Sequence, residues 1–391
     1  MIKRLQSAFS DPFNWIAFIL LAILLRGIVW MYFGHLVHVH LSPDETISKY
    51  FVKDDYIYFF SPVDNYFRTG HYTYLDGVPF TGRMPGYSIV YFLARFIFSQ
   101  QFALWAVIIL QFLLSAISVY ALSLVAYYIF NNSKRIFYFT YGLYILAVYP
   151  GFFDFFIIAE SFSVSAFIFS LYYLSKYIYV ESQKKYLLLA GFFLTWTIFT
   201  REYTGMIIIL FPSVLFFYLF FTKKELFAKT IWNIFLFCLP FALCETAWVT
   251  RNYLATNKII LLTTPEEQTY GKLYSAPWQV IDNLVYTWGE NASPFDNTTL
   301  GYYYRKTDES INYKFPPPIF HNVSTYNADS LVMLKALYKE YYTTSDSIKS
   351  NALEKAILSR CERYKNDYIS HNEFAYWVIK PLKDIKYLVF F

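Results

Sequence analysis

The sequence predicts an all-α polytopic membrane protein, because of its composition, its long apolar stretches and the placing of its cations. Of its 391 residues, 57% are hydrophobic and 23% aromatic, whereas only 16% are charged. An ordinary soluble domain has about 25% charged residues. We therefore expect a chain that is embedded in a lipid bilayer.

Seven apolar stretches come close to the length of about 20 residues that a helix needs to cross a bilayer. They predict a bundle of seven spans near residues 13–33, 103–130, 136–152, 157–178, 186–200, 204–222 and 230–249. The first stretch lacks a small-residue cleavage site, so we interpret it as a span and not as a signal peptide.

The cations predict the orientation of these spans. If the seven spans alternate, one membrane side carries Lys3, Arg4, Lys134, Arg135, Lys176, Lys184, Lys185, Lys223, Lys224 and Lys229. An excess of Lys and Arg marks the cytoplasmic side. The formal charge of +5 falls within residues 1–251, whereas residues 252–391 are balanced. The basic excess is thus explained by membrane topology, and no nucleic-acid partner is predicted.

Charged residues at the other ends of the spans are predicted to share the outer surface. They are Asp54, Asp55, Arg83, Asp154, Glu160, Arg201, Glu202, Glu245 and Arg251. Any one of them could simply end its helix among the lipid headgroups. Because charges at membrane depth are costly and usually functional, the whole set predicts a functional surface.

The first outer loop, residues 34–101, is too long for a simple connection and predicts a folded layer with interfacial helices. Pro85 and Gly86 form a turn, after which the pattern predicts a helix over residues 87–99. A helix of that length cannot cross a bilayer, so we expect it to lie in the interface with Arg95 reaching the headgroups.

Asp54 and Asp55 are the first candidates for chemistry in this loop. Ser-Pro motifs at Ser42 and Ser61 predict two helix starts, and Gly70 predicts the end of the second helix. The acidic residues within those motifs are explained as helix caps. Asp54 and Asp55 lie between the two helices, where capping does not account for both carboxylates.

An acid about fifteen residues before Gly70, followed by the turn Arg83-Met84-Pro85-Gly86-Tyr87, resembles the first outer loop of GT-C glycosyltransferases. These are polytopic enzymes that use polyprenyl-phosphate sugars, as protein mannosyltransferases and aminoarabinose transferases do. Similar motifs follow in the same order at Pro150 with Glu160-Ser161, at Thr200-Arg201 with Gly205, and at Thr250-Arg251-Asn252-Tyr253. The resemblance covers roughly residues 10–260. Glu202 stands where the family commonly has Pro.

The resemblance implies transfer of a sugar from a polyprenyl phosphate to a glycan, lipid or protein acceptor, with inversion at the anomeric carbon. Asp55, or Asp54 beside it, would be the base that takes the acceptor proton. Arg201 and Arg251 would bind the donor phosphate first, since guanidinium groups bind phosphate in two places. Arg83 would assist them.

The resemblance also implies supporting roles for Glu160, Tyr58 and Tyr87. No cofactor is expected. His35, His38 and His40 have a spacing that could hold a divalent metal, but neither a Cys nor paired carboxylates accompany them, so the sequence does not support a metal site.

Residues 1–251 are therefore predicted to form the GT-C-like membrane domain, and residues 252–391 an extracytoplasmic, α-rich soluble region. Helical periodicity predicts helices over residues 328–342 and 346–368, whereas residues 258–326 are expected to be mostly loop. The high usage of Tyr, Phe, Ile and Lys is typical of a bacterial protein from a low-GC genome. We expect the inner membrane, with the active site on the outer side.

Three alternatives stay open. A ligase or polymerase of lipid-linked glycans would use Arg and His in a late outer loop, and Arg305, His321 and His371 are present there. A transporter would also carry intramembrane charges, although no internal repeat supports this reading. A non-catalytic relative of the transferases is the third.

Overall fold

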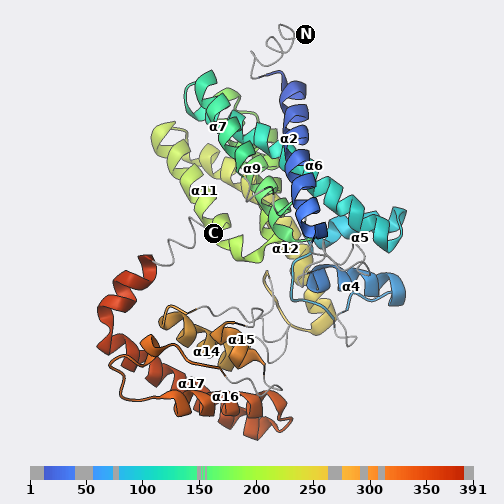
Figure 1. Ribbon diagram of the computed structural model, residues 1–391. Coiled ribbons are helices and arrows are strands. Elements are labelled where there is room, and N and C mark those ends of the chain that lie inside the picture. The colour runs from blue at the N-terminus through green and yellow to red at the C-terminus, as the bar shows by residue number, and fades with distance from the viewer. Residues whose placement is uncertain are drawn as a thin grey trace. The chain divides into compact units, whose positions relative to one another are not determined.

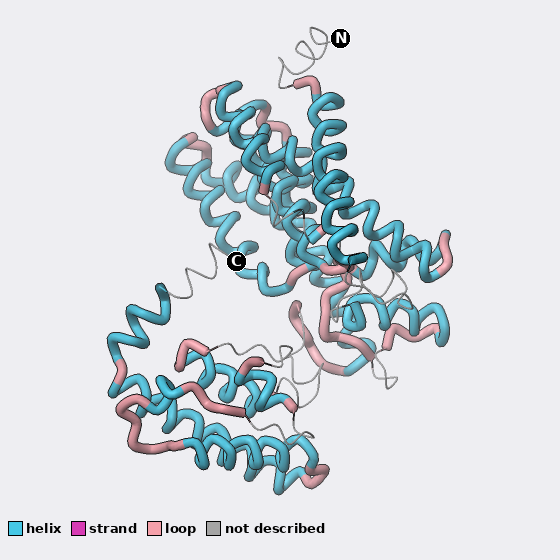
Figure 2. Tube along the Cα trace, in the orientation of Figure 1, coloured by secondary structure: helices cyan, strands magenta, loops and turns pink. Residues whose placement is uncertain are grey.

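The computed structural model describes residues 13–39, 56–73, 79–147, 151, 153–154, 156–262, 275–290, 298–306 and 313–382. The chain forms two compact units, Met1–Thr264 and Pro265–Phe391, which are described separately. Helices make up the regular structure of the described residues, where the only β-bridge is an isolated one between Thr73 and Pro79 (Figures 1 and 2). The predicted all-α class is therefore confirmed.

The first unit is a bundle of apolar helices. They are α2 (Trp15–Val39), α6 (Gln100–Ile129), α7 (Lys134–Leu146), α9 (Ala159–Ser175), α10 (Lys184–Thr200), α11 (Ile207–Phe217) and α12 (Phe227–Thr256). In this bundle α9 packs against both α6 and α10, α10 packs against α12, and α2 packs against α6. Their outer faces are apolar as well, as expected for helices that contact lipid.

Four helical segments of the described residues are long and apolar enough to cross a membrane. They are Trp15–Tyr32, Gln100–Ile129, Glu202–Thr222 and Phe227–Thr256. The three other predicted spans correspond to α7, α9 and α10, which have 13, 17 and 17 residues. The structure thus supports a membrane protein built around four candidate spans.

Small side chains bring α9, α10 and α12 close together. A Cβ atom at Gly191 of α10 would lie only 1.9 Å from the carbonyl oxygen of Phe237 in α12. Glycine therefore permits a backbone approach that alanine would prevent. Helix α9 also lies close to α10, because the hydroxyl of Ser170 in α9 donates a 2.9 Å hydrogen bond to the carbonyl oxygen of Ala190 in α10.

The segment between α2 and α6, which the sequence predicts to be the first outer loop and which keeps that name here, contains α4 (Tyr56–Thr69) and α5 (Ser88–Ile97). Helix α4 begins at Tyr56 and continues through Pro62, so the helix start predicted at Ser61 is wrong. It ends where predicted, at Gly70, whose φ of 78° lies in the left-handed region that favours glycine. Helix α5 follows the Pro85–Gly86 turn as predicted, although it is shorter than expected.

Asp64 joins α4 to the two helices that follow it. Its carboxylate accepts hydrogen bonds from the hydroxyl of Tyr91 at 2.9 Å and from the amide of Gln100 at 3.0 Å. Arg95 Nε lies 3.3 Å from the same carboxylate. Arg95 is therefore bound within the loop, and its predicted contact with the lipid headgroups stays a prediction.

The second unit is also helical. It contains α14 (Ala276–Thr287), α15 (Leu300–Arg305), α16 (Ala328–Thr343), α17 (Ser347–His371) and η6 (Ala375–Ile379). The two predicted helices correspond to α16 and α17. Helices α14 and α15 lie within the stretch that we expected to be mostly loop. They are short and show no long periodic pattern, so the sequence did not reveal them, and their apolar residues pack into the core. Trp278, Ile281, Tyr338 and Tyr364 are buried in that core.

Candidate functional site

The Pro85–Gly86 turn is fixed against the end of α10. The backbone N–H of Gly86 donates to the carbonyl oxygen of Phe199 at 2.9 Å, and the indole N–H of Trp196 donates to the carbonyl oxygen of Gly86 at 2.9 Å. A Cβ atom at Gly86 would lie 2.3 Å from the carbonyl carbon of Phe199. This close approach explains why glycine stands in the turn.

Two ion pairs surround this turn. Arg83 pairs with Glu202, and Arg201 pairs with Glu160. Both guanidinium groups lie over the ring of Phe59 in α4, at 5.4 Å for Arg83 and 5.9 Å for Arg201. The ion cluster formed by these two pairs therefore joins the first outer loop to α9 and to the end of α10.

The local backbone explains why adjacent residues contribute to different pairs. Helix α10 ends at Thr200, and Arg201 has an extended backbone with φ −140° and ψ 97°. The 3₁₀ helix η2 (Glu202–Met206) begins directly afterwards. Because extended backbone sends successive side chains in opposite directions, Arg201 reaches Glu160 whereas Glu202 reaches Arg83.

Gln111 connects the ion cluster to the segment between α7 and α9, which is called the second outer loop here. This fully buried residue of α6 accepts a 3.2 Å hydrogen bond from the hydroxyl of Tyr87. Its amide nitrogen donates to the carbonyl oxygens of Asp154 at 2.8 Å and Phe156 at 2.7 Å. The sequence analysis missed Gln111. A single amide within a long apolar helix was the signal that could have identified it.

Tyr87 lies close enough to the ion cluster to be influenced by its charges. Burial, together with the negative charge of Glu160, holds the pKa of the Tyr87 hydroxyl well above its usual value. The hydroxyl therefore stays protonated at neutral pH and acts as a neutral hydrogen-bond donor to Gln111.

Asp154 is a buried carboxyl group next to this network. Burial raises its pKa to about 6, although the Ser161 hydroxyl, which donates to it at 2.5 Å, and the positive charge of Arg26 both oppose the shift. Arg26 donates to the carbonyl oxygen of Tyr144 at 3.3 Å, and Gly151 leaves room for its guanidinium. These contacts tie α2 to α7 and to the segment that follows α7.

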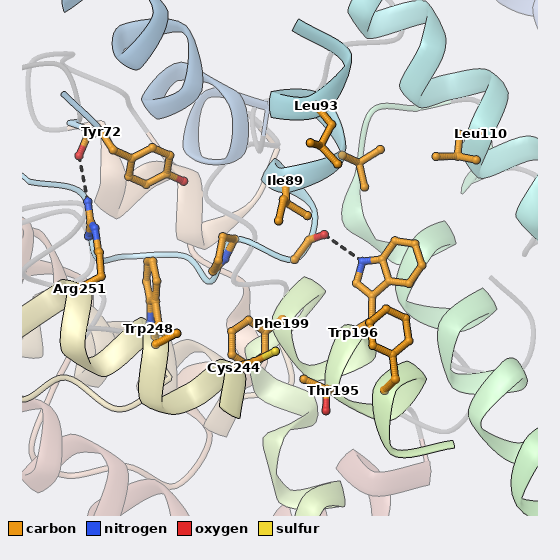
Figure 3. A pocket seen from close by; sticks show the side chains of 15 residues that line it. Tyr72, Ile89, Leu93, Leu110, Thr195, Trp196, Phe199, Cys244, Trp248 and Arg251 are labelled. Atoms are coloured by element: carbon orange, nitrogen blue, oxygen red, sulfur yellow. Dashed lines mark hydrogen bonds between the residues drawn. The ribbon is translucent and has the colours of Figure 1, made fainter. Parts of the chain in front are cut away.

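An apolar groove of about 760 Å³ lies beside the Pro85–Gly86 turn, and both residues of the turn belong to its lining. Figure 3 shows this groove. Residues of α5, α6, α10 and α12 form its walls. Ile89 and Leu93 of α5 and Phe192 of α10 line it while remaining 50%, 59% and 49% exposed. The groove is therefore continuous with an apolar outer surface, as a site for a hydrocarbon chain would be.

Arg251 lies at one end of the groove, next to Tyr72 (Figure 3). Its guanidinium donates to the carbonyl oxygens of Phe80 at 2.6 Å and Tyr72 at 3.1 Å, and to the side-chain oxygen of Asn252 at 2.9 Å. Among the described residues these acceptors are neutral, and no carboxylate pairs with Arg251. Its positive charge is thus uncompensated there, unlike the charges of Arg83 and Arg201.

The structure brings four of the sequence-predicted residues together, namely Arg83, Arg201, Glu160 and Tyr87. Arg251 belongs to the groove and contacts Tyr72 and Phe80 instead. Tyr58 lies in the first turn of α4 and is half-buried. The roles assigned to these residues stay predictions.

Several predicted features lie outside the described residues. Asp54, Asp55, the helix start at Ser42 and the side chains of His35, His38 and His40 are among them. Elsewhere, in the part of the chain that is described, no group of three or more His, Cys, Asp and Glu residues is arranged to hold a metal ion.

Two of the late residues considered for a ligase lie near each other in the second unit. Asn372 follows His371 directly in the chain. Its side-chain amide donates a hydrogen bond to the carbonyl oxygen of His321 at 2.9 Å. Nδ1 of His371 lies 2.9 Å from the carbonyl oxygen of Asp367, at the end of α17. These contacts join the end of the helix to the segment before α16.

Comparisons of the chain with family models, curated proteins and solved structures give no match.

Proposed function

We propose that this protein is a membrane glycosyltransferase that moves a sugar from a polyprenyl-phosphate carrier to an extracytoplasmic acceptor. The apolar groove that ends at Arg251 carries the proposal. A polyprenyl phosphate joins a long hydrocarbon to a charged diester, and the groove offers an apolar channel with a guanidinium at its end. The family resemblance of the sequence supports the same substrate.

Charge decides which guanidinium is the best phosphate ligand. Arg83 and Arg201 are each neutralised by a glutamate, whereas Arg251 contacts neutral oxygens among the described residues. A phosphate would replace some of these neutral acceptors and gain charge-assisted hydrogen bonds, which are about twice as strong as neutral ones. We therefore assign the donor phosphate to Arg251. This differs from the expectation from sequence, which placed Arg201 beside it.

The ion cluster then has a positioning role. It fixes the first outer loop to α9 and α10, and it holds Phe59 of α4 against two guanidinium groups. Asp55 precedes Phe59 by four residues in the chain, directly before the first residue of α4. A base at Asp55 would thus belong to the segment that the ion cluster orients.

In the proposed reaction, Asp55 takes the proton of the acceptor hydroxyl as the acceptor oxygen bonds to the anomeric carbon. The bond from that carbon to the phosphate oxygen breaks, and its electron pair stays with the phosphate. The departing phosphate gains negative charge, which a preorganised guanidinium stabilises. Attack opposite the leaving group inverts the anomeric centre.

The proposal keeps the topology predicted from the sequence. It places seven spans in a bacterial inner membrane, with α7, α9 and α10 crossing alongside the four longer segments. The ion cluster and the groove mouth would then face the extracytoplasmic side. Labelling of single cysteines introduced at Lys184 and at Asn291 tests this arrangement, because the two sites should be accessible from opposite sides of the membrane.

The groove can be tested with a photoreactive polyprenyl-phosphate analogue and the full-length protein in nanodiscs. Ala247→Trp fills the groove, whereas Leu254→Trp places the same side chain at an exposed site on the same helix, α12. We expect Ala247→Trp to lose cross-linking and Leu254→Trp to retain it. Arg251→Met should weaken cross-linking by about tenfold or more, which corresponds to the loss of one charge-assisted contact.

The chemistry needs a separate measurement, with radiolabelled polyprenyl-phosphate sugars and membranes as the source of acceptor. Asp55→Asn should cross-link normally and transfer no sugar. Equal cross-linking of Ala247→Trp and the wild type would refute the groove as the lipid site. Normal transfer by Asp55→Asn would assign the base to another residue.

A further inference from the structure

A second cavity, of about 520 Å³, lies among α2, α6 and α9. Helix α2 contributes Trp15 and Ile19 from its first turns, and α6 contributes residues from Ile117 to Tyr128 in its second half. The Pro85–Gly86 turn and the ion cluster are associated with the other end of α6, where Ala103 and Val107 share a core with Tyr87. The cavity thus lies toward the opposite end of the bundle.

Aromatic rings and one cation line this cavity. Tyr120, Tyr128, Tyr172 and Tyr173 surround it together with aliphatic side chains, and Lys176 is the one charged group among the described residues of its lining. An apolar chamber with a cation at its edge matches the chemistry of a lipid that has an anionic headgroup.

The ammonium group of Lys176 is held by two aromatic rings. Lys176 Nζ lies 5.3 Å from the ring centre of Tyr172 and 5.0 Å from that of Tyr186. At the same residue α9 gives way to the π-helix η1 (Lys176–Val180). Such widened turns are rare and occur frequently at functional sites. In the described structure no carboxylate pairs with Lys176, so its charge is available to an anion.

The surroundings of the cavity match a membrane boundary. Trp15, at the start of α2, and Val180 line the cavity and are 57% and 53% exposed. Tryptophan is enriched where the hydrocarbon meets the headgroups. Helices α7 and α10 begin at this same end of the bundle with Lys134-Arg135 and Lys184-Lys185. Such a cluster of cations attracts anionic lipids.

We infer that this cavity is a binding site for an anionic glycerophospholipid, with an acyl chain among the tyrosine rings and the phosphate at Lys176. A bilayer, which the four candidate spans are long and apolar enough to cross, supplies this ligand. The cation selects an anionic headgroup over a zwitterionic one, because the positive choline or ethanolamine group of a zwitterionic lipid offsets the attraction of its phosphate. The inference does not depend on the proposed transfer of sugar.

Native mass spectrometry of the full-length protein, released from detergent with phosphatidylglycerol or phosphatidylcholine, tests the site. We expect the wild type to retain phosphatidylglycerol preferentially. Lys176→Met should weaken that retention by about tenfold, as expected for the loss of one charge-assisted contact. Lys176→Arg keeps the charge and should retain the lipid.

Lys185→Met is the matched control, because Lys185 contacts the same Tyr186 ring at 5.1 Å but does not line the cavity. It should retain phosphatidylglycerol as the wild type does. Inorganic phosphate should not compete, since the acyl chain contributes to binding. Equal retention of both lipids by the wild type, or equal loss in Lys176→Met and Lys185→Met, would overturn the inference. Thermal unfolding of each variant without added lipid shows that it is folded.

Discussion

Arg83, in the first outer loop, and Glu202, at the start of η2, form an ion pair across 119 positions of the sequence. Both side chains are largely shielded from solvent, with exposed fractions of 15% and 14%. The pair lies beside the Pro85–Gly86 turn, which α10 holds through backbone hydrogen bonds. The first outer loop is therefore fixed by charge and by backbone contacts at the same place.

Removing one partner of this pair should destabilise the protein more than removing both. Glu202→Met removes the carboxylate that pairs with the shielded Arg83 guanidinium, at a cost of about 3 kcal/mol. The double variant Arg83→Met with Glu202→Met removes both charges and should recover most of that loss. Thermal unfolding of the single and double variants in nanodiscs measures the coupling. Additive effects would show that the pair contributes no stability of its own.

Gln111→Leu should loosen both outer loops. The substitution leaves the carbonyl oxygens of Asp154 and Phe156 and the hydroxyl of Tyr87 without the amide that now binds them. Each buried polar group left unpaired costs about 1–3 kcal/mol. We expect a lowered unfolding temperature and faster hydrogen exchange in both outer loops.

Ser123→Ala is the control for Gln111→Leu, because Ser123 is also buried in α6 but donates only within its own helix, to Val119 at 2.7 Å. It should leave exchange in the outer loops unchanged. Comparable exchange in both variants would mean that Gln111 does not connect the loops.

Gly86→Ala should displace the turn from α10. The added methyl group would overlap with the backbone of Phe199 and Thr200, which cannot move like a flexible side chain. Gly142→Ala on α7 is the matched control, since nothing lies within 4 Å of its position and alanine favours helices. Cross-linking of the polyprenyl-phosphate analogue should fall in Gly86→Ala and persist in Gly142→Ala. If both variants retained cross-linking, the position of the turn would not affect lipid binding in the groove.

Asp154 should make stability depend on pH. Its pKa is raised from 3.8 to about 6 in the folded protein, mainly by burial. A raised pKa means that the folded state binds the proton more tightly than the unfolded state. The resulting stabilisation is fully present below the unfolded pKa and is lost as the pH rises through about 6.

The wild type should therefore lose up to about 3 kcal/mol relative to Asp154→Asn when the pH rises from about 4 to 7. Unfolding temperatures of both proteins over this range provide the measurement. Ser161→Ala removes the hydroxyl that favours the ionised form, so its transition should move to higher pH. Parallel curves for the wild type and Asp154→Asn would show that Asp154 does not titrate in this range.

Local patterns were enough to predict much of the helical structure. The end of α4 at Gly70 and the start of α5 after Pro85–Gly86 follow from backbone conformation, which neighbouring residues determine. The start of α4 was mispredicted because Ser61-Pro62 resembles a helix cap, whereas tertiary contacts continue the helix through it. Phe59 and Phe60, at the end of the true first turn, are both fully buried.

Partners distant in sequence could not be predicted in the same way. The sequence predicts that Arg201 and Arg251 bind one phosphate; it did not predict that Arg201 pairs with Glu160 and that Arg251 lines the groove. Which carboxylate meets which guanidinium depends on how each helix is rotated about its axis. That rotation is determined by packing, for example by the approach of α10 to α12 at Gly191.

The sequence by itself determined the class of this protein, since its apolar composition and long uncharged stretches require helices that satisfy their own backbone in lipid. Only the tertiary structure decided the rest: the ion pairs, the buried amide of Gln111 and the apolar groove, where Arg251 meets neutral acceptors among the residues that the structure describes. The physical reason is that backbone hydrogen bonds in a helix join near neighbours, whereas side-chain pairing depends on distances that exist only after the helices have packed.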